Sequence, residues 1–194
     1  GFGLKVGEIS KGQFAARVRT LVAGHTMLER VAEAMLSARE ALRVEFGKLH
    51  RAMLAIVRAD AVCRRLMTVP GVGALVAVTF TSGVDAPERF ARSKGVGAHF
   101  GLTPRKHQSG ETDITGAVSR VGDAMVRTAL YEAAHILLTR AVRFSALKRW
   151  ALEVAKRRGM RRAKVALARK LAIVLHRIWV DGTTFRWGRE IAAA

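Results

Sequence analysis

One serine stands in a basic setting that would suit attack on a phosphate group. Ser109 is followed by Gly110, and four basic residues lie near it in the chain: Arg105, Lys106, Arg120 and Arg127. A serine hydroxyl that attacks phosphorus must lose its proton, and cations must balance the charge on the non-bridging oxygens. Arginine suits the second task, so the segment is a candidate for phosphoryl-transfer chemistry.

The same residues also have a simpler interpretation. A serine beside a glycine is usually a turn residue, which needs no chemical role. His107 could accept a proton from Ser109 or could merely be its neighbour. Ser119 is typical of a helix N-cap and is expected to begin the next helix. From the residues alone, both interpretations of Ser109 stay open.

Metal and cofactor chemistry find little support in the composition. The acids near the candidate serine, Glu111, Asp113 and Asp123, have no spacing that would place three carboxylates around one ion. The six histidines form no pair four residues apart, and the single cysteine, Cys63, excludes both an internal disulfide and a zinc site with several thiolates. We therefore expect this chain to bind no metal or cofactor.

A glycine-rich turn is a second candidate for phosphate contact. Pro70-Gly71-Val72-Gly73 separates two apolar segments and predicts a tight hairpin between two short helices. Such a helix-hairpin-helix motif directs backbone N–H groups and a helix N-terminus outward. Gly71 and Gly73 would then bind a phosphate without contacting its base.

The charge of the chain favours a polyanionic partner. Lysine and arginine number 34 against 15 acids, a net charge of +19, while half of the residues are hydrophobic and can form a core. Between Arg140 and Arg177 there are 13 basic residues and one acid, Glu153. Five of them surround one helix–helix junction and are expected to contact phosphates: Arg157, Arg158, Arg161, Arg162 and Lys164. Nucleic acid is the first expected partner. A membrane span is not expected, because one proline and three glycines interrupt the longest uncharged stretch. A membrane partner is not expected either, because the hydrophobic positions are expected to be used in packing.

The elements that position these residues are expected to be mainly α-helical. Leu28, Met35, Leu42, Leu49 and Ile56 recur every seven residues, which predicts one long coiled-coil-like helix from Met27 to Arg65. That helix could pair with a second copy of the chain or pack within it. A shorter helix is expected over 12–22, and a helical bundle after the hairpin, with helices near 74–81, 92–99, 145–158 and 161–180. Residues 101–118 are expected to form a polar loop. We divide the chain into a helical connector (1–65), a domain with the helix-hairpin-helix (66–185) and a tail (186–194).

Six short motifs occur in an order that is characteristic of one family. They are Leu66-Met-Thr-Val-Pro-Gly-Val-Gly73, Arg89-Phe90, Phe100-Gly-Leu-Thr-Pro-Arg105, Gln108-Ser-Gly110, Val118-Ser-Arg-Val-Gly122 and Val126-Arg127. Over about residues 66–180 the chain resembles the C-terminal domain of the IS-one-ten insertion-sequence transposases, which are related to the Piv DNA invertases and the bridge-RNA-guided recombinases. Residues 27–65 resemble the coiled-coil connector of that family.

The resemblance implies a role for the candidate serine. In the family, a serine after Gly-Leu-Thr-Pro-Arg attacks a phosphodiester and becomes covalently linked to DNA, and Ser109 occupies that position. An N-terminal RuvC-like domain with four acids binds magnesium, the two halves of the active site come from different subunits, and a structured RNA guides the reaction. Ser119 falls in a framework motif. Two positions depart from the family pattern, Arg120 for a usual lysine and Asp123 for a neutral residue or histidine.

The resemblance also implies that a part is missing. No strand-rich segment with an acidic quartet precedes Gly12, so we expect a C-terminal fragment that binds DNA and a guide RNA but is inactive without the magnesium-binding half. The expected assembly is a homo-oligomer through the long helix, in the cytoplasm with the nucleoid. Two alternatives remain: a non-catalytic helix-hairpin-helix module and an RNA-binding scaffold.

Overall fold

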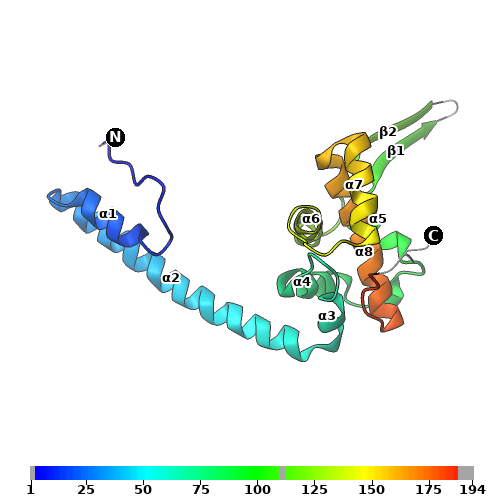
Figure 1. The fold of residues 1–194 in the computed structure, drawn as a ribbon, viewed down its shortest axis with the longest axis horizontal. Helices are drawn as coiled ribbons and strands as arrows, with labels where there is room; N and C mark the ends of the chain where they lie inside the picture. Colours follow the sequence, from blue (N-terminus) through cyan, green and yellow to red (C-terminus); the bar gives the residue numbers. More distant parts are fainter. Residues whose placement is uncertain (1–2, 110–111, 188–194) are drawn as a thin grey trace. The chain divides into compact units, whose positions relative to one another are not determined.

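The structure is a computed structural model that describes residues 3–109 and 112–187, with backbone alone for 107, 108 and 112–115. In chain order the elements are α1 (Phe14–Val22), α2 (Thr26–Ala59), α3 (Ala61–Leu66), α4 (Ala74–Val84), the 3-10 helix η1 (Pro87–Arg89), α5 (Lys94–His99), β1 (Pro104–Ser109), β2 (Thr112–Val118), α6 (Ala124–Thr139), α7 (Ala146–Arg158) and α8 (Met160–Asp181) (Figure 1). The prediction of a mainly helical fold is confirmed.

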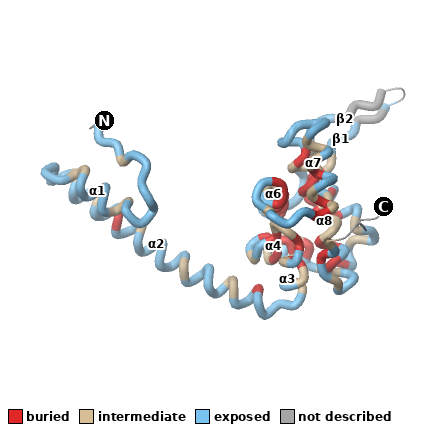
Figure 2. The backbone as a smooth tube through the Cα atoms, in the orientation of Figure 1, coloured by how far each residue is buried: buried red, intermediate tan, exposed pale blue. Residues whose placement is uncertain are grey.

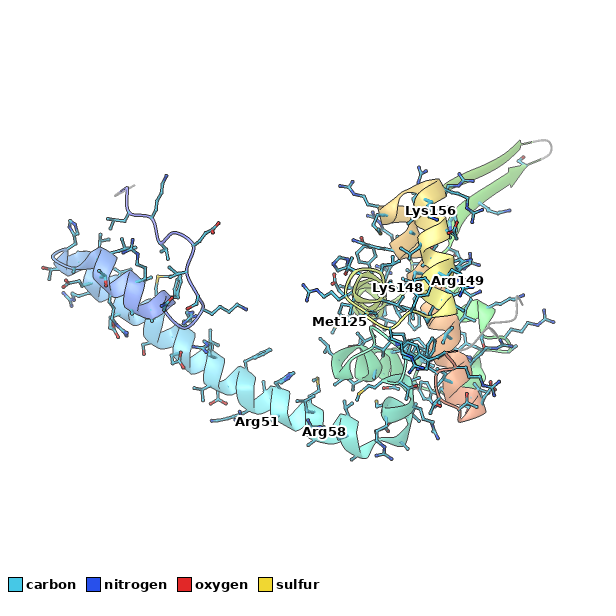
Figure 3. All side chains as sticks on the ribbon, in the orientation of Figure 1. Arg51, Arg58, Met125, Lys148, Arg149 and Lys156 are labelled. Atoms are coloured by element: carbon cyan, nitrogen blue, oxygen red, sulfur yellow. The ribbon has the colours of Figure 1, made fainter. Side chains whose placement is uncertain are left out.

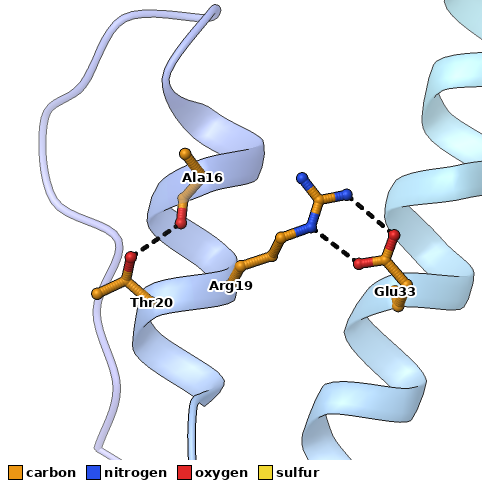
Figure 4. Close-up of polar contacts among 4 residues, drawn as sticks. All are labelled: Ala16, Arg19, Thr20 and Glu33. Carbon is orange, nitrogen blue, oxygen red and sulfur yellow. Dashed lines mark hydrogen bonds and ion pairs between the residues drawn. The ribbon is translucent and has the colours of Figure 1, made fainter.

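The chain divides into two compact units, and the first consists of residues 1–53. In it α1 lies against α2 through a two-pronged ion pair: Nε and Nη2 of Arg19 each donate to a Glu33 oxygen at 2.9 Å (Figure 4). The hydrogen bond from Arg19 lowers the pKa of the Glu33 carboxyl. The Arg39 guanidinium also lies 4.9 Å from the centre of the Phe14 ring. The ion pair is exposed, and Leu36 is the one buried apolar side chain among the described residues of this unit, so the unit has little buried core (Figure 2).

Helix α2 keeps its seven-residue stripe exposed. Met35, Leu42, Leu49 and Ile56 are between 65% and 71% exposed, although each is large and apolar. An apolar stripe of this length is typical of a helix that has a partner, so the coiled coil remains a prediction.

The prediction that the long helix runs on to Arg65 is wrong. Helix α2 ends at Ala59, and Asp60 takes an extended conformation (φ −76°, ψ 121°). The Asp60 carboxylate accepts a hydrogen bond from the backbone N–H of Cys63 at 2.6 Å and begins α3 as an N-cap. The cap competes with continuation of the helix, and a seven-residue repeat cannot reveal this.

The second unit begins at Leu54 and contains the core. Helix α8 is its central element, and α3, α5, α6 and α7 all pack against it, while α4 packs on α6. Leu167, Leu171 and Leu175 of α8 are fully buried, as are Phe80 and Phe100. The expected helices at 74–81, 92–99, 145–158 and 161–180 correspond to α4, α5, α7 and α8. Among the helices that the structure describes, none is long and apolar enough to cross a bilayer.

The prediction of a polar loop over 101–118 is wrong. Strands β1 and β2 form an antiparallel hairpin in which Ser109 pairs with Thr112 and Pro104 with Val118, with one irregularity between Pro104 and Lys106. A two-stranded hairpin without a buried face needs no alternation of apolar and polar residues, so the usual strand signal is missing here.

The prediction that Ser119 caps the following helix is also wrong. Helix α6 begins after Asp123, whose carboxylate accepts from the N–H groups of Met125 (2.6 Å) and Val126 (3.1 Å). Aspartate is as good an N-cap as serine. The backbone of Ser119 instead belongs to the base of the hairpin, where its N–H donates to the carbonyl of Thr103 at 2.9 Å.

Candidate functional site

Ser109 lies at the far end of the hairpin. It is the last residue of β1 and is exposed, and the hairpin extends beyond the helices of its unit (Figure 1). The following pair, Gly110 and Glu111, lies outside the described residues. An exposed hydroxyl at this position is open to a large ligand such as a nucleic acid.

Close backbone packing holds the base of the hairpin to the helical body. The N–H of Arg120 donates to the carbonyl of Gly101 at 3.1 Å. Gly101 (φ +64°) and Gly122 (φ +79°) have positive φ values, and a Cβ on Gly122 would lie 2.1 Å from the carbonyl oxygen of His99. Only glycine fits both the conformation and the space, so these residues set where the hairpin leaves the body.

Two of the predicted phosphate ligands contribute to this base. Nη1 of Arg127 donates to the carbonyls of Phe100 (3.3 Å), Val121 (3.1 Å) and Gly122 (3.4 Å). Nη2 of Arg105 donates to the carbonyl of Ser119 at 3.2 Å. Sequence reasoning assigned both arginines to phosphate and missed these contacts. The glycines on either side were the one available signal, because they indicate close backbone approach.

The other two predicted cations of this segment are exposed. Lys106 lies on β1, and Arg120 follows the hairpin with a positive φ of 57°, a conformation that costs a non-glycine residue energy. Among the described side chains, no hydrogen bond or ion pair joins Ser109 to a basic residue. The structure thus places Ser109, Arg105 and Lys106 on one strand and Arg120 just beyond the other. The side chain of His107 lies outside the described part.

The junction of α7 and α8 carries the predicted basic cluster. Gly159 turns the chain there with a φ of +81°, and Arg157, Arg158, Arg161 and Arg162 are all exposed. Nε of Arg157 donates to the carbonyl of Glu153 at 3.3 Å, and Nζ of Lys164 lies 5.9 Å from the centre of the Tyr131 ring. In residues 3–109 and 112–187, no acid forms an ion pair with any of these five.

Neighbouring side chains of α7 extend this basic surface. Lys148, Arg149 and Lys156 all lie on α7 (Figure 3). Nζ of Lys148 donates to the carbonyl of Ala141 at 2.6 Å, and Lys156 pairs with Glu153 at 2.9 Å, whereas Arg149 lies 5.9 Å from the Phe144 ring. At the junction itself, the side chains of Arg158, Arg161 and Arg162 make no hydrogen bond, ion pair or ring contact within the described residues.

The two glycines of the predicted helix-hairpin-helix differ in their surroundings. Gly71 has a φ of +87°, and a Cβ there would lie 2.4 Å from the carbonyl oxygen of Ala133 in α6. Gly73 is exposed, has open space around it and precedes α4 as its N-cap. Helices α3 and α4 do pack on each other across the turn. Gly71 thus serves the packing of the turn, and Gly73 alone leaves room for a ligand.

The residues present do not fit a metal ion. Among the described residues, no group of three His, Cys, Asp or Glu side chains could hold one. The described part of the chain therefore offers no cluster of ligands for the magnesium that the resemblance implies.

Comparisons with known proteins find similarity to transposases. Residues 63–150 match the model of the Transposase IS116/IS110/IS902 family. The transposase for insertion sequence element IS1111A of Coxiella burnetii is 35% identical over 144 residues, which are 73% of this chain and 39% of that protein. A "Probable family 20 transposase" of Pseudomonas aeruginosa is 31% identical over 150 residues, 77% of this chain and 44% of that protein. The chain therefore spans less than half the length of these relatives, and the matches support a transposase of this family.

Proposed function

We propose that this chain is the C-terminal part of a transposase of the IS116/IS110/IS902 family, which binds DNA and supplies Ser109 as the nucleophile for strand cleavage. The carrying observation is the exposed hydroxyl of Ser109 at the end of a hairpin whose base is held by Arg105 and Arg127. The match over residues 63–150 and the transposases that resemble the chain support the same assignment.

The proposed step is a transesterification at phosphorus. The Ser109 oxygen forms a bond to the phosphorus of a DNA phosphodiester, and the bond from phosphorus to the leaving sugar oxygen breaks. The serine proton passes to a base, and the leaving oxygen takes up a proton. Lys106 and Arg120 are exposed and would balance charge on the non-bridging oxygens.

The cleavage centre is proposed to be composite. The family resemblance implies a magnesium-binding half outside residues 66–180, which would stabilise the charge on the leaving oxygen. This chain alone would then bind nucleic acid without recombining it. A guide RNA and association with the nucleoid belong to the same proposal and rest on the family resemblance.

Helix α2 is proposed to bring two copies of the chain together. Its exposed stripe of Met35, Leu42, Leu49 and Ile56 has the seven-residue spacing of a coiled coil. A second subunit would cover these side chains, and a dimer of this kind is what the composite active site implied by the family resemblance requires.

A covalent adduct tests the assignment of the nucleophile. The chain is combined with the metal-binding domain of a full-length relative, magnesium and labelled element-end DNA, and the products are separated on a denaturing gel. We expect a labelled protein–DNA band with the native chain and none with Ser109→Ala, because the alanine has no oxygen to bond to phosphorus.

Ser119→Ala is the matched control, because Ser119 contributes its backbone to the hairpin base and should form adduct at the native level. Adduct with Ser109→Ala would show that another group attacks. A third outcome is that the native chain and both variants bind DNA without forming any adduct, at a metal concentration at which the full-length relative is active. That result would favour a non-catalytic DNA-binding module.

A further inference from the structure

A cleft of about 710 Å³ lies in the second unit, far along α8 from the basic junction with α7. The C-terminal half of α8 forms one wall, and the segment from η1 to the start of α5 forms the other. Val62 and Arg65 of α3 close one side. This volume falls within the range of small-ligand pockets in proteins, about 300–1,000 Å³.

A buried histidine fixes the second wall. His176 is 2% exposed, and its Nε2 donates to the carbonyl oxygen of Pro87 at 3.0 Å. When the ring is neutral, its Nδ1 then accepts from the hydroxyl of Ser93, also at 3.0 Å. The Phe90 ring packs edge-on against the same imidazole, with the centroids 5.5 Å apart. Since one side chain holds both ends of the segment 87–93, the cleft is formed before any ligand binds.

The lining of the cleft contains more basic than acidic side chains, and the basic ones form no ion pairs within the described residues. Five basic side chains contribute to it, against two exposed acids, Glu88 and Asp181. The five are Arg65, Arg92, Lys94, Lys170 and Arg177. Over the described ranges, none of the five forms an ion pair with an acid. Nε of Arg65 is buried and has no hydrogen-bond partner there.

The remaining lining is apolar and partly aromatic. Ile173, Val174 and Trp179 of α8 are half-buried, as is Phe90 on the facing segment. A groove that combines cations with aromatic rings is the usual site for a single strand, whose phosphates meet the cations and whose bases stack on the rings. A duplex offers the phosphates but keeps its bases stacked inside. The aromatic wall therefore favours unpaired nucleotides over a duplex.

We propose that this cleft binds an unpaired segment of DNA or RNA, with phosphates at Arg92 and Lys94 and a base against the wall that contains Phe90 and Trp179. The site goes beyond the proposed function, because it involves none of the residues assigned to cleavage or to the basic junction. It rests on that function only for the class of ligand. Failure of the Ser109 assignment would leave it untouched.

Fluorescence anisotropy with 15-nucleotide oligonucleotides tests whether the cleft binds single strands. The full chain is titrated with single-stranded DNA, single-stranded RNA and duplex DNA between 50 and 300 mM KCl. For Arg92→Gln/Lys94→Gln, we expect the slope of log affinity against log salt for single strands to fall by about 1.4, since each lost phosphate contact removes about 0.7. The affinity for duplex DNA should change less than the affinity for single strands. The ratio of the affinities for single-stranded DNA and single-stranded RNA shows which of the two the cleft prefers.

A second variant isolates the stacking contact. Trp179→Leu should weaken single-strand binding by about five-fold or more without changing the salt slope, because stacking involves no counterion release. Thermal unfolding of each variant checks that the fold is retained.

Two control variants match the charge changes. Arg92→Lys/Lys94→Arg keeps both charges and should bind like the native chain. Arg30→Gln/Arg51→Gln removes two exposed charges from α2 and should leave the single-strand slope unchanged. Equal losses in the cleft and α2 variants would overturn the proposal, as would equal losses for duplex and single strands. Equal competition by a poly-glutamate peptide would mean that the cleft takes an acidic protein segment instead.

Discussion

Among the arginines predicted to contact phosphate, the sequence does not distinguish those that donate to backbone carbonyls from those that do not. Arg127 and Arg105 donate to backbone carbonyls and hold the hairpin base, whereas Arg158, Arg161 and Arg162 are exposed and have no acidic partner among the described residues. Replacing Arg127 or Arg105 would remove a donor from these carbonyls, the part-buried one of Phe100 among them. The residues that shape the site and those that would contact phosphate therefore require separate tests.

The two glycines of the 70–73 turn offer such a test. Gly71→Ser should lower the free energy of unfolding by about 2 kcal/mol or more, because its Cβ would meet the carbonyl of Ala133 and its φ is positive. Gly73→Ser should change it by less than about 0.5 kcal/mol, since serine is a good N-cap and the space is open. Urea unfolding followed by circular dichroism measures both.

Gly71→Ser and Gly73→Ser also distinguish an effect on folding from an effect on DNA binding. If Gly73 lies at a phosphate contact, Gly73→Ser should weaken duplex binding while the protein stays folded. Equal stability of the two serine variants would contradict the packing that the structure shows around Gly71.

Helix ends and strand pairing decide how the elements present the candidate residues. Asp60 ends the long helix and begins α3, and Asp123 begins α6 directly after the hairpin. Both are short polar side chains that accept backbone N–H groups, so they redirect the chain where apolar periodicity would let a helix continue. The hairpin, in turn, carries Ser109 away from the packed helices.

At the level of α2, we expect the exposed stripe to mediate self-association. Met35→Gln/Leu42→Gln should shift the chain toward the monomer, because burial of these side chains supplies the driving force of a coiled coil. Analytical ultracentrifugation over a concentration series measures the change. Ser37→Gln/Val44→Gln has the same spacing on the opposite side of the helix and should leave the association constant unchanged. A native chain that stays monomeric at the highest concentration would refute the self-association.

For the whole molecule, we expect the net charge of +19 to make the proposed nucleic-acid binding dependent on salt concentration. Because the charge is spread over many elements, a loss of affinity alone does not locate a site. The change in salt slope does, since it counts the phosphates that a surface neutralises.

We expect the α7–α8 junction to carry a large share of duplex binding. Arg158→Gln/Arg161→Gln/Arg162→Gln should reduce the salt slope for duplex DNA by about 2.7, at about 0.9 for each lost contact. Arg30→Gln/Arg51→Gln/Arg58→Gln removes the same charge from α2 and should leave the slope nearly unchanged; two of its residues appear in Figure 3. Equal slopes for the two triple variants would mean that binding follows total charge and not the junction.

Much of the molecule follows from local patterns along the chain. The spacing of Leu28, Met35 and Leu42 predicted a long helix where α2 lies, and the expected helix over 161–180 corresponds to α8, because helix signals act over a few residues. The motifs around Ser109 led to the same family as the match over residues 63–150.

Other features depend on residues that are distant in the chain and meet only in the folded protein. The hairpin is held by pairing between strands and by Gly101 and Gly122, whose tight fit exists only when the helices are packed. Arg127 finds its carbonyls, and His176 finds Pro87 and Ser93, only across long chain separations. Composition revealed that the protein is basic; packing decided which of its cations are tied to the backbone and which remain available to a ligand.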